Sequence, residues 1–568
     1  MRAAEPARRF QKSAAMRSPR PQKHPRSIHS LSFLWRFLVL IPWGLAAQTQ
    51  KVASSFPVDA PEVPRGVRAE AMGKAWTEAE SGPLVGLREF ARERSGAVWL
   101  GSERGAARFD PTAQHPWDRW QYFAGRRWLA HDDAVANIVI EESGPVRKIW
   151  IRTRLGVSCL EWRPMTLGAK AAFFEARIEA RHERHGMIGS SRLRRPGDLA
   201  TSETRDDDND GLWTAMYLGA EAYRFAVTQA PEARARAKRA VEALMRLEAI
   251  TGVAGFPARS FVSSKYPKPA TGEWHATPDG QWWWKGDTSS DEIVGHYFGY
   301  ALYHDLVATE SERPAVRRVV ARITDHLIQH DYNLVDLDGQ PTRWGEWSER
   351  YFQTEEGKYE APLRALELLA FLKTAHHITG DAKYAEAYAE RVARGYATRL
   401  RDYRRWPGGG EINFSDDELA YLSYDPLLRY ERDATLRAIY TESLAFTWGQ
   451  IRPDRNPLWN YISAARGAVT MTPEILQESA RTLERIPLDL IDWKVVNSLR
   501  RDVKMQATLD RFEGPQLQAV LAPDERPLAK WNANPYRPDG GSGGGSEDDG
   551  AFFLLPYWLG RFHGWLQE

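Results

Sequence analysis

The sequence predicts a mainly helical fold, because two kinds of helix alternate along most of the chain. Six apolar, aromatic-rich segments, nearly all opening on an acidic cluster, are separated by about five helices charged on one face. An apolar helix needs burial on all sides, whereas a one-sided helix covers a core. We therefore expect an (α/α)-toroid over residues 170–568, with buried helices forming an inner ring. Irregular spacing, without a short motif at a fixed period, disfavours the alternative, an α-solenoid.

The apolar helices are expected to begin beside carboxylates. Their predicted first residues are Asp210, Asp291, Glu360, Asp417, Trp459 and Asp549. A carboxylate suits a helix start because the free N–H groups and the helix dipole favour negative charge. In a toroid, the same helix ends also meet at one cavity, so capping and chemistry are compatible.

Residues 1–47 read as a signal peptide. Nine basic residues fall within the first 36, and the apolar run "FLVLIPWGLAA" (Phe37–Ala47) ends in small residues. The run is too short for a comfortable membrane span, although an N-terminal anchor is the alternative. We expect a periplasmic or secreted protein with no membrane span after signal removal.

Charge and cysteine content argue against a nucleic-acid-binding protein and against a fold held by disulfides or by a multi-cysteine zinc site. The formal charge of +2 becomes about −6 when the nine basic residues and one acid of the leader are removed. A mildly acidic protein is a poor partner for nucleic acid. The single cysteine, Cys159, excludes an internal disulfide framework and a multi-cysteine zinc site.

A small β module is expected before the helices. Residues 48–85 are rich in Pro, Ala and charge and are interpreted as a linker, and the module covers 86–165. It contains two similar pieces, Ala97–Asp110 and Ile149–Trp162, each with a short strand, a polar turn and a second strand. The motif W-I-x-T-x-x-G-V in the second piece resembles the repeats of two-component-regulator propellers. Because a propeller needs at least four blades, two repeats cannot close one.

The segment "QWWWKGDTSSDEIVGHYFGY" combines aromatic, acidic and basic groups before the second inner helix. Adjacent residues cannot all face a core, so at least one tryptophan of Trp282–Trp284 is expected at a cleft. His296 and Tyr300 share a helix face, four residues apart. For His296, a buried core position is the alternative to a functional one.

A second polar aromatic segment, "DLDGQPTRWGEWSERYFQ", is expected to form a turn or hairpin before the third inner helix. It carries Arg343, Trp344, Glu346 and Trp347. The guanidinium of Arg343 could bind a carboxylate through two hydrogen bonds. The alternative is a surface Arg–Glu pair.

The run "DDDNDGLW" matches only half of a calcium loop. Asp206, Asp208 and Asp210 occupy ligand positions, but Tyr217 stands where the last carboxylate is required, which excludes an EF-hand. We expect no cofactor and no catalytic metal, with a structural calcium of another type as the alternative. Asn209 and Asp210 are instead expected to face the cleft.

With its inner-ring helices, Trp-rich loops and leader, the chain resembles toroidal carbohydrate-active enzymes, both polysaccharide lyases and inverting glycoside hydrolases. A kinship with lyases that cut rhamnose–glucuronate linkages is a finer hypothesis. The resemblance implies a polysaccharide or oligosaccharide substrate. The residues expected to bind it are Trp282, Trp283, Trp284, Trp344, Trp347, Lys285, Asp210, Asp291 and Asp417.

The resemblance to toroidal lyases implies β-elimination at a uronic acid. In those lyases Asn or Arg neutralises the substrate carboxylate, His or Tyr is the base, and Tyr is the acid. Here the roles would fall to Asn209 and Arg343, to His296, and to Tyr297 or Tyr351, respectively.

Two other hypotheses remain open. An inverting hydrolase needs two carboxylates about 6.5–9.5 Å apart, and the candidates are Asp210, Asp291, Glu346 and Asp417. The propeller-like repeats also allow a glycan-binding sensor module without catalytic activity.

The elimination hypothesis predicts that His296→Ala abolishes an unsaturated product that absorbs in the ultraviolet, because the base is lost. Incubation with a panel of polysaccharides is the measurement. Saturated reducing ends would indicate hydrolysis instead, and binding without turnover would indicate a sensor.

Overall fold

The computed structural model describes residues 49–57, 59–65, 82–131, 134–144, 146–404, 413–507, 514–527 and 530–568. The predicted signal peptide lies outside these residues. Within the part of the chain that is described, no helix is both long and apolar enough to cross a membrane.

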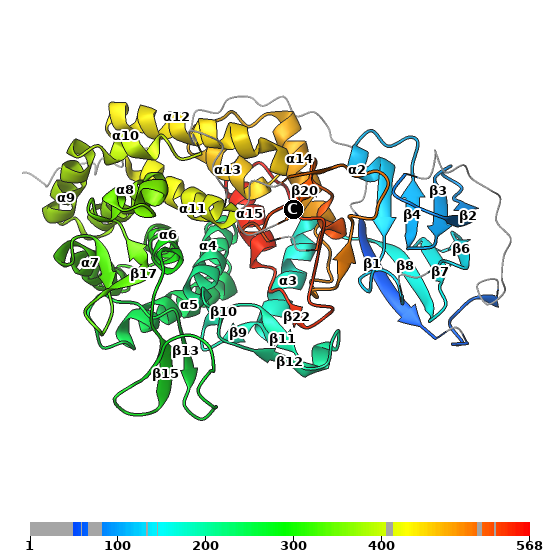
Figure 1. Ribbon diagram of the computed structural model, residues 1–568, viewed down its shortest axis with the longest axis horizontal. Helices are drawn as coiled ribbons and strands as arrows, with labels where there is room; N and C mark the ends of the chain where they lie inside the picture. Colours follow the sequence, from blue (N-terminus) through cyan, green and yellow to red (C-terminus); the bar gives the residue numbers. More distant parts are fainter. Residues whose placement is uncertain are drawn as a thin grey trace, which may run out of the picture. The chain divides into compact units, whose positions relative to one another are not determined.

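Two four-stranded antiparallel sheets precede the helices (Figure 1). The first is a meander of β2 (Leu87–Arg92), β3 (Val98–Ser102), β4 (Ala106–Phe109) and β5 (Trp120–Phe123). The second has the order β1-β8-β7-β6, with β1 (Thr49–Phe56), β6 (Asn137–Glu141), β7 (Lys148–Arg152) and β8 (Val157–Pro164). Trp99, Phe123 and Trp162 pack in a core that both sheets share. The two propeller-like pieces correspond to the hairpins β3–β4 and β7–β8.

The segment interpreted as a linker begins as a strand. β1 pairs with β8 along its whole length, from Thr49 opposite Pro164 to Phe56 opposite Val157. The composition of 48–85 does not reveal this strand, because its partner lies about a hundred residues further along the chain. Residues 66–81 are outside the described part.

The rest of the structure is mostly helical. One set of helices is buried on nearly all sides, and each member packs on the next. α15 also packs on α4, which closes the set into a ring (Figure 1). The members are α4 (Asp210–Thr228), α6 (Ser290–Leu306), α8 (Gly357–Thr379), α11 (Phe414–Tyr430), α13 (Pro457–Ala465) and α15 (Ala551–Phe562). Their first residues lie within three positions of the predicted starts.

A second set of helices packs outside the first and exposes charged faces. These are α3 (Leu167–Arg181), α5 (Pro231–Ala249), α7 (Arg313–Gln329), α9 (Ala382–Ala393), α10 (Tyr396–Leu400), α12 (Ala434–Ile451) and α14 (Pro473–Arg485). Apolar residues on one face and Lys, Arg and Glu on the other produce this position.

Short strands lead into two of the inner helices. Before α6 lies a three-stranded sheet of β13 (Ser260–Ser263), β14 (Trp274–Ala276) and β15 (Trp282–Lys285). Before α8 lies the hairpin of β16 (Asn333–Val335) and β17 (Pro341–Glu346). The tryptophan run is therefore a strand, and the Arg343 segment forms the expected hairpin.

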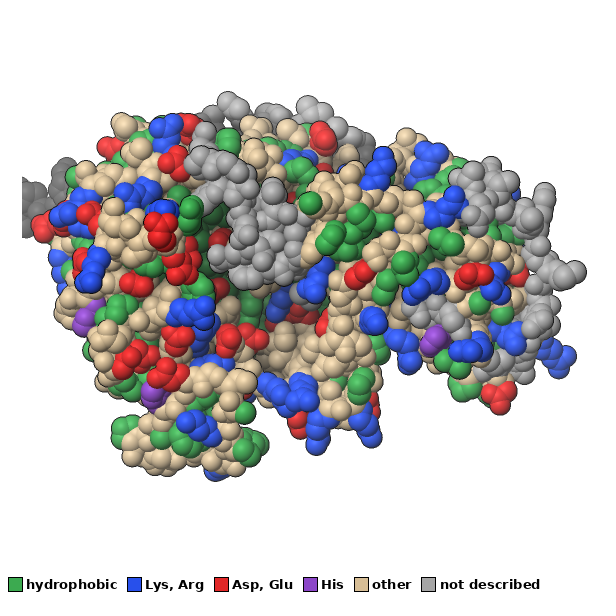
Figure 2. Space-filling model, in the orientation of Figure 1, with side chains coloured by type: hydrophobic (Ala, Val, Ile, Leu, Met, Phe, Trp, Pro, Cys, Tyr) green, Lys and Arg blue, Asp and Glu red, His purple; other side chains and the backbone are tan. Residues whose placement is uncertain are grey.

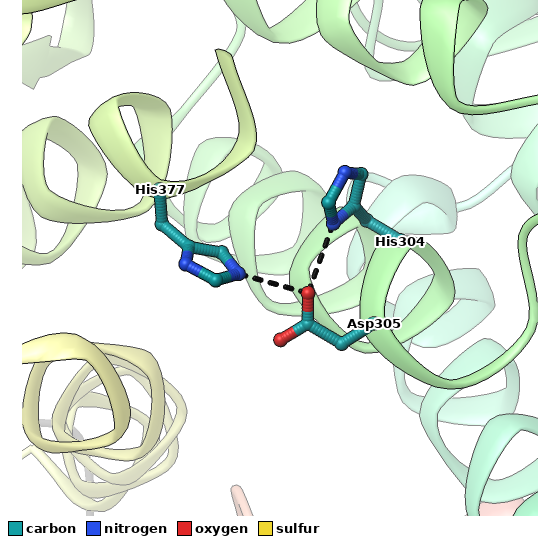
Figure 3. Close-up of side chains that lie close together, drawn as sticks. All are labelled: His304, Asp305 and His377. Atoms are coloured by element: carbon teal, nitrogen blue, oxygen red, sulfur yellow. Dashed lines mark hydrogen bonds and ion pairs between the residues drawn. The ribbon is translucent and has the colours of Figure 1, made fainter. Parts of the chain in front are cut away.

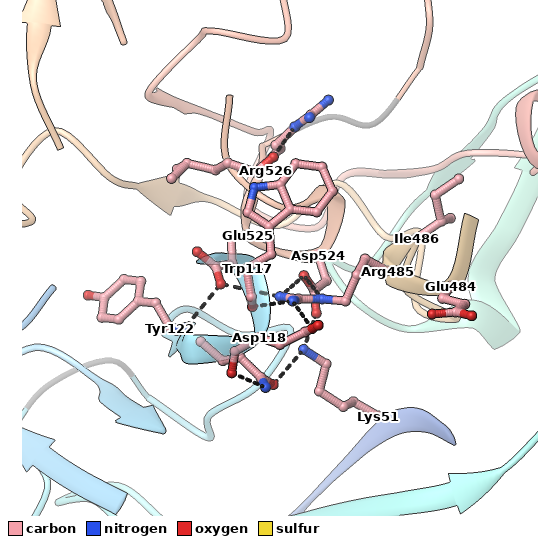
Figure 4. Close-up of polar contacts among 12 residues, drawn as sticks. Lys51, Trp117, Asp118, Tyr122, Glu484, Arg485, Ile486, Asp524, Glu525 and Arg526 are labelled. Carbon is pink, nitrogen blue, oxygen red and sulfur yellow. Dashed lines mark hydrogen bonds and ion pairs between the residues drawn. The ribbon is translucent and has the colours of Figure 1, made fainter. Parts of the chain in front are cut away.

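A buried ion-pair network joins the β module to the segments that follow the outer helix α14. Asp524 pairs with Arg485 at 2.7 Å between Oδ1 and Nη2, and it also pairs with Lys51 of β1 (Figure 4). Burial, reinforced by the nearby Arg485 charge, lowers the pKa of Lys51 to about 8. The carbonyl of Trp117 accepts a further hydrogen bond from Arg485.

Glycine allows α4 and α6 to approach closely. A Cβ added at Gly295 would lie 2.8 Å from the Cα of Leu212, a backbone atom that cannot move aside independently. At Gly219, the same addition would meet the ring of Phe298 at 2.8 Å. The two helices thus pack at a distance that larger residues would prevent.

We expect Gly295→Ala to destabilise the protein by about 1–3 kcal/mol, because it overpacks the α4–α6 contact. The free energy of unfolding in urea measures this. Gly449→Ala in α12 is the matched control, since a Cβ there meets nothing within 4 Å, and it should stabilise by about 0.5–1 kcal/mol. Equal effects at the two positions would contradict close packing at Gly295.

Candidate functional site

Carboxyl groups gather where the inner helices begin. We call this end of the ring the mouth. Burial raises the pKa values of Glu367, Asp416 and Glu418, and the negative charge of Asp291 on α6 adds to each increase. Groups of α6, α8 and α11 are thus close enough to interact. Acidic side chains gather on the face turned to the viewer in Figure 2, beside a hollow.

Asp416 is a half-buried carboxyl group in the first turn of α11. Its Oδ1 accepts a hydrogen bond of 2.9 Å from Nδ2 of Asn413. Burial raises its pKa to about 8; Arg364 opposes the increase, while Glu360 and Asp291 reinforce it. Asp416 therefore holds a proton at neutral pH and can still reach solvent.

Glu418 borders a small cavity in the mouth. Its Oε2 is buried and has no hydrogen-bond partner among the described residues. Burial raises its pKa to about 8, against the opposing charge of Lys530. The Nζ of Lys530 lies 4.2 Å from the centre of the Trp213 ring. The cavity is lined by Trp213, Met216, Glu418, Lys530, Asp549, Ala551 and Phe552.

Two predicted acids are held by other side chains. Asp210 is hydrogen-bonded to Arg184 at 2.6 Å and to Ser260 at 2.5 Å. Asp417 accepts a 2.8 Å hydrogen bond from Nε of Arg404. Both carboxyl groups are almost fully buried, so these contacts position the helix starts and leave little surface for a substrate.

The first turns of α8 form a connected polar wall. Glu367 Oε2 accepts hydrogen bonds from Trp347 Nε1 at 2.7 Å and from Arg364 Nη1 at 3.2 Å. The hydroxyl of Tyr351 donates to Glu360 Oε2 at 3.0 Å. Trp347 was predicted to bind substrate and Tyr351 to be catalytic. Both side chains are buried, and both hold α8 in place through these hydrogen bonds.

Glu346, a predicted hydrolase candidate, lies at the end of β17. Its side chain is half-buried, and burial raises its pKa. The Arg364 charge opposes that increase, whereas Glu356 and Glu360 reinforce it. Glu346 therefore belongs to the same acidic surroundings as the wall of α8.

The residues expected to catalyse elimination do not meet at one surface. His296 is fully buried, its Nδ1 is 2.7 Å from the carbonyl oxygen of Glu292, and burial lowers its pKa to about 4. Tyr297 is also buried and bonds to Thr324 through its hydroxyl at 2.7 Å. Arg343, by contrast, is exposed. His296 and Tyr297 lie in the middle of α6, where the helix is enclosed by its neighbours.

Asn209 lies in the mouth, as expected from its place before α4. Its Nδ2 is 3.4 Å from Asp291 Oδ1, and its Oδ1 accepts a hydrogen bond of 3.1 Å from Arg259. The amide thus links a carboxylate to a guanidinium. Asp291 keeps partial exposure.

The predicted sugar-stacking tryptophans differ in accessibility. Trp284 is buried, with His275 4.4 Å away between ring centres. Trp282 and Trp283 retain partial exposure, and Arg246 lies 4.0 Å from the Trp282 ring centre. Because alternate residues of a strand share a face, Trp282 and Trp284 lie on one face of β15 and Trp283 on the other, and the difference between Trp282 and Trp284 comes from what covers that face along its length.

Trp344 and Lys285 already have protein partners. Arg343 lies over the Trp344 ring, 4.6 Å from its centre. Lys285 pairs with Asp206 at 3.4 Å and Asp208 at 2.5 Å. Lys285 therefore neutralises the two aspartates that a structural calcium would otherwise have bound.

The comparisons with known proteins give distant likenesses only. No family model and no curated protein matches the sequence. Similar solved structures include a sugar epimerase from a ruminal bacterium (10% identity, 70% of this chain and 100% of that one, TM-score 0.39). Others are a family 76 glycoside hydrolase from a bovine Bacteroides thetaiotaomicron strain (10%, 85% and 100%, 0.40) and cellobiose 2-epimerase from Spirochaeta thermophila (14%, 71% and 98%, 0.37). TM-scores below 0.5 do not establish a common fold, so the ring rests on the helix contacts described above.

The two acids with the most unusual surroundings belong to an acidic run expected at the mouth of an inner helix, but they were not among the predicted site residues. Sequence reasoning singled out Asp417 from three successive acids, whereas Asp416 and Glu418 are the two that lack an arginine partner in a salt bridge among the residues described. The acidic run could have indicated them. Successive residues of a helix point in different directions, so three acids in a row must have different surroundings. Lys530 carries no comparable signal in the sequence.

We expect Glu418→Gln to reduce the pH dependence of stability. The pKa of Glu418 is 4.5 in the unfolded chain and about 8 in the folded protein. The folded state is therefore favoured by the full amount below pH 4.5, where Glu418 is protonated in both states, and this part of the stability is lost as pH rises from about 4.5 to about 8. One pKa unit corresponds to about 1.4 kcal/mol, so the loss amounts to several kcal/mol. The variant should therefore gain stability relative to wild type at pH 8 but not at pH 5.

Urea denaturation at several pH values measures the difference. Glu474→Gln, at an exposed residue in the first turn of α14, is the control and should follow wild type. Parallel curves for Glu418→Gln and wild type would show that Glu418 titrates normally.

Proposed function

We propose that the protein is an exported (α/α)-toroid enzyme that hydrolyses glycosidic bonds, with a β module before the toroid. Asp416 would be the general acid and Asp291 the carboxylate that activates water. The observation that carries this proposal is the place of Asp416, a half-buried carboxyl group in the first turn of α11 that accepts a hydrogen bond from Asn413; burial, with the Asp291 charge adding to it, raises its pKa to about 8.

Hydrolysis with two carboxyl groups needs one protonated and one ionised group. The acid donates a proton to the leaving oxygen while the carboxylate removes a proton from water. Environments that push two pKa values apart allow both forms to exist at neutral pH. Burial and the neighbouring acids keep Asp416 protonated, whereas Asp291 interacts with the amide of Asn209.

The charge of the mouth favours a neutral sugar substrate. The Asp291 carboxylate would repel a uronic acid, and two cations close to the acids already have partners: Arg364 with Glu360 and Glu367, and Lys530 with Asp548. Elimination needs a free cation for the substrate carboxylate. This supports hydrolysis over the lyase hypothesis.

Two features of the mouth offer contacts to a sugar. Trp213 provides an aromatic ring in the cavity wall, and sugar rings stack on such surfaces. Glu418 offers a carboxyl oxygen that has no hydrogen-bond partner among the residues described and that could accept a hydrogen bond from, or donate one to, a sugar hydroxyl group. Both lie at the starts of inner helices.

We expect Asp416→Asn to lower kcat about 10²–10⁴-fold on a neutral glycan, because the proton donor is lost. Release of saturated reducing ends from a panel of neutral and uronate-containing polysaccharides measures activity. The wild-type rate should fall as pH rises through about 8, since a group with that pKa loses its proton there.

Glu474→Gln again provides a control on the outside of the ring and should retain wild-type activity. Full activity of Asp416→Asn would refute the assignment of the acid. Unsaturated ends, released from uronate polysaccharides alone, would refute hydrolysis itself.

A further inference from the structure

Three side chains that commonly bind metal converge at the other ends of two inner helices. His304 and Asp305 are in the last turn of α6, and His377 is in the last turn of α8. One nitrogen of each histidine and one carboxylate oxygen all lie within 4.8 Å of one another. Both imidazoles point toward the carboxylate in Figure 3.

A single carboxylate oxygen is the centre of this cluster. Asp305 Oδ1 lies 2.9 Å from His304 Nδ1 and 2.9 Å from His377 Nε2. The other oxygen, Oδ2, accepts a hydrogen bond of 2.8 Å from the Tyr430 hydroxyl. That contact fixes the carboxylate orientation, as outer partners of metal ligands do.

The rings are also held in place. The ring of His377 stacks on that of Tyr430, with centres 3.8 Å apart and an angle of 14°. The side chain of His304 is 10% exposed, that of Asp305 24% and that of His377 37%. The cluster is therefore supported from one side by protein and open to water from the other.

We propose that His304 Nδ1, Asp305 Oδ1 and His377 Nε2 bind one late first-row divalent cation, with zinc as the best fit. Two imidazoles and a carboxylate suit zinc, and a water molecule would complete four ligands. Bonds of about 2.0–2.1 Å in a tetrahedron place ligand atoms about 3.3 Å apart. The two oxygen–nitrogen distances of 2.9 Å would lengthen to that separation, and the two nitrogens, within 4.8 Å of each other, would adopt it as well.

The ligand set argues against a hard cation. Calcium and magnesium prefer six or more oxygen ligands, many of them carboxylates or carbonyls. This cluster offers two nitrogens and a single carboxylate. A second carboxylate does not belong to the group formed by the described residues.

The site is separate from the mouth. His304 follows Asp291 by thirteen residues on α6, which corresponds to about 20 Å at 1.5 Å per residue. An ion here would join the final turns of α6 and α8, which pack against each other in the ring. Its role would be to stabilise the ring, and the proposal does not depend on the reaction at the mouth.

Titration of untagged, EDTA-treated full-length protein with zinc chloride in a calorimeter tests the site. We expect one equivalent bound with a Kd in the micromolar range or below. His377→Ala should weaken binding about 100-fold or more, because a ligand is removed. His376→Ala is the matched control, because the ring of His376 hydrogen-bonds to the carbonyl of Asp381 and does not belong to the cluster. This variant should bind zinc as wild type does.

Two further measurements do not depend on affinity alone. Cobalt substituted for zinc should give the intense visible absorption of a tetrahedral site in wild type but not in His377→Ala. Zinc should also raise the thermal midpoint of wild type, while leaving that of His377→Ala unchanged. The circular dichroism of His377→Ala checks that the variant is folded. If it is not folded, the same measurements are made on His377→Gln.

Absence of zinc binding to wild type, or equal binding to wild type and His377→Ala, would overturn the proposal. The cluster would then be a hydrogen-bonded His–Asp–His chain. Glycan hydrolysis by His377→Ala should equal that of wild type, so failure of the metal site and failure of the proposed reaction are distinguishable.

Discussion

The chemistry at the mouth depends on the packing of α15 against α4. That contact closes the ring, and closure forces the acidic first turns of the inner helices to share one space. Burial then raises the pKa values of Asp416 and Glu418 to about 8. The free N–H groups of each helix start favour the ionised form, but here burial is the larger effect. An open array of the same helices would leave these carboxyl groups in water and ionised at neutral pH.

The acids of the mouth divide into two groups with different surroundings. Asp210 and Asp417 each have an arginine partner, which pins the start of α4 or α11. Asp416 and Glu418 lack such a partner among the residues described, and Asp291 contacts the Asn209 amide. The arginine partners compensate the buried charge of Asp210 and Asp417, whereas Asp416 and Glu418, with raised pKa values, lower the stability of the fold as pH rises toward 8. Such a cost is typical of groups retained for binding or catalysis.

The helices could be predicted from the sequence better than their side-chain directions. Apolar aromatic runs and acidic starts place α4 and α11 close to their true beginnings, because both signals are local. An entirely apolar helix has no preferred face, so the sequence could not show that His296 and Tyr297 point into the core. The choice between Asp416 and Asp417 depends on Arg404, whose pairing with Asp417 cannot be read from the sequence. β1 was missed for the same reason, since only its pairing with β8 makes it a strand.

The order β1-β8-β7-β6 means that one sheet is assembled from two stretches of chain separated by the other sheet. A fragment starting at residue 86 would lack β1 and would expose β8 as an unpaired edge, which invites aggregation. It would also lose Lys51, leaving Asp524 with less positive charge in a buried place. Truncations made to isolate the helical part therefore carry a solubility hazard unless they remove both sheets together.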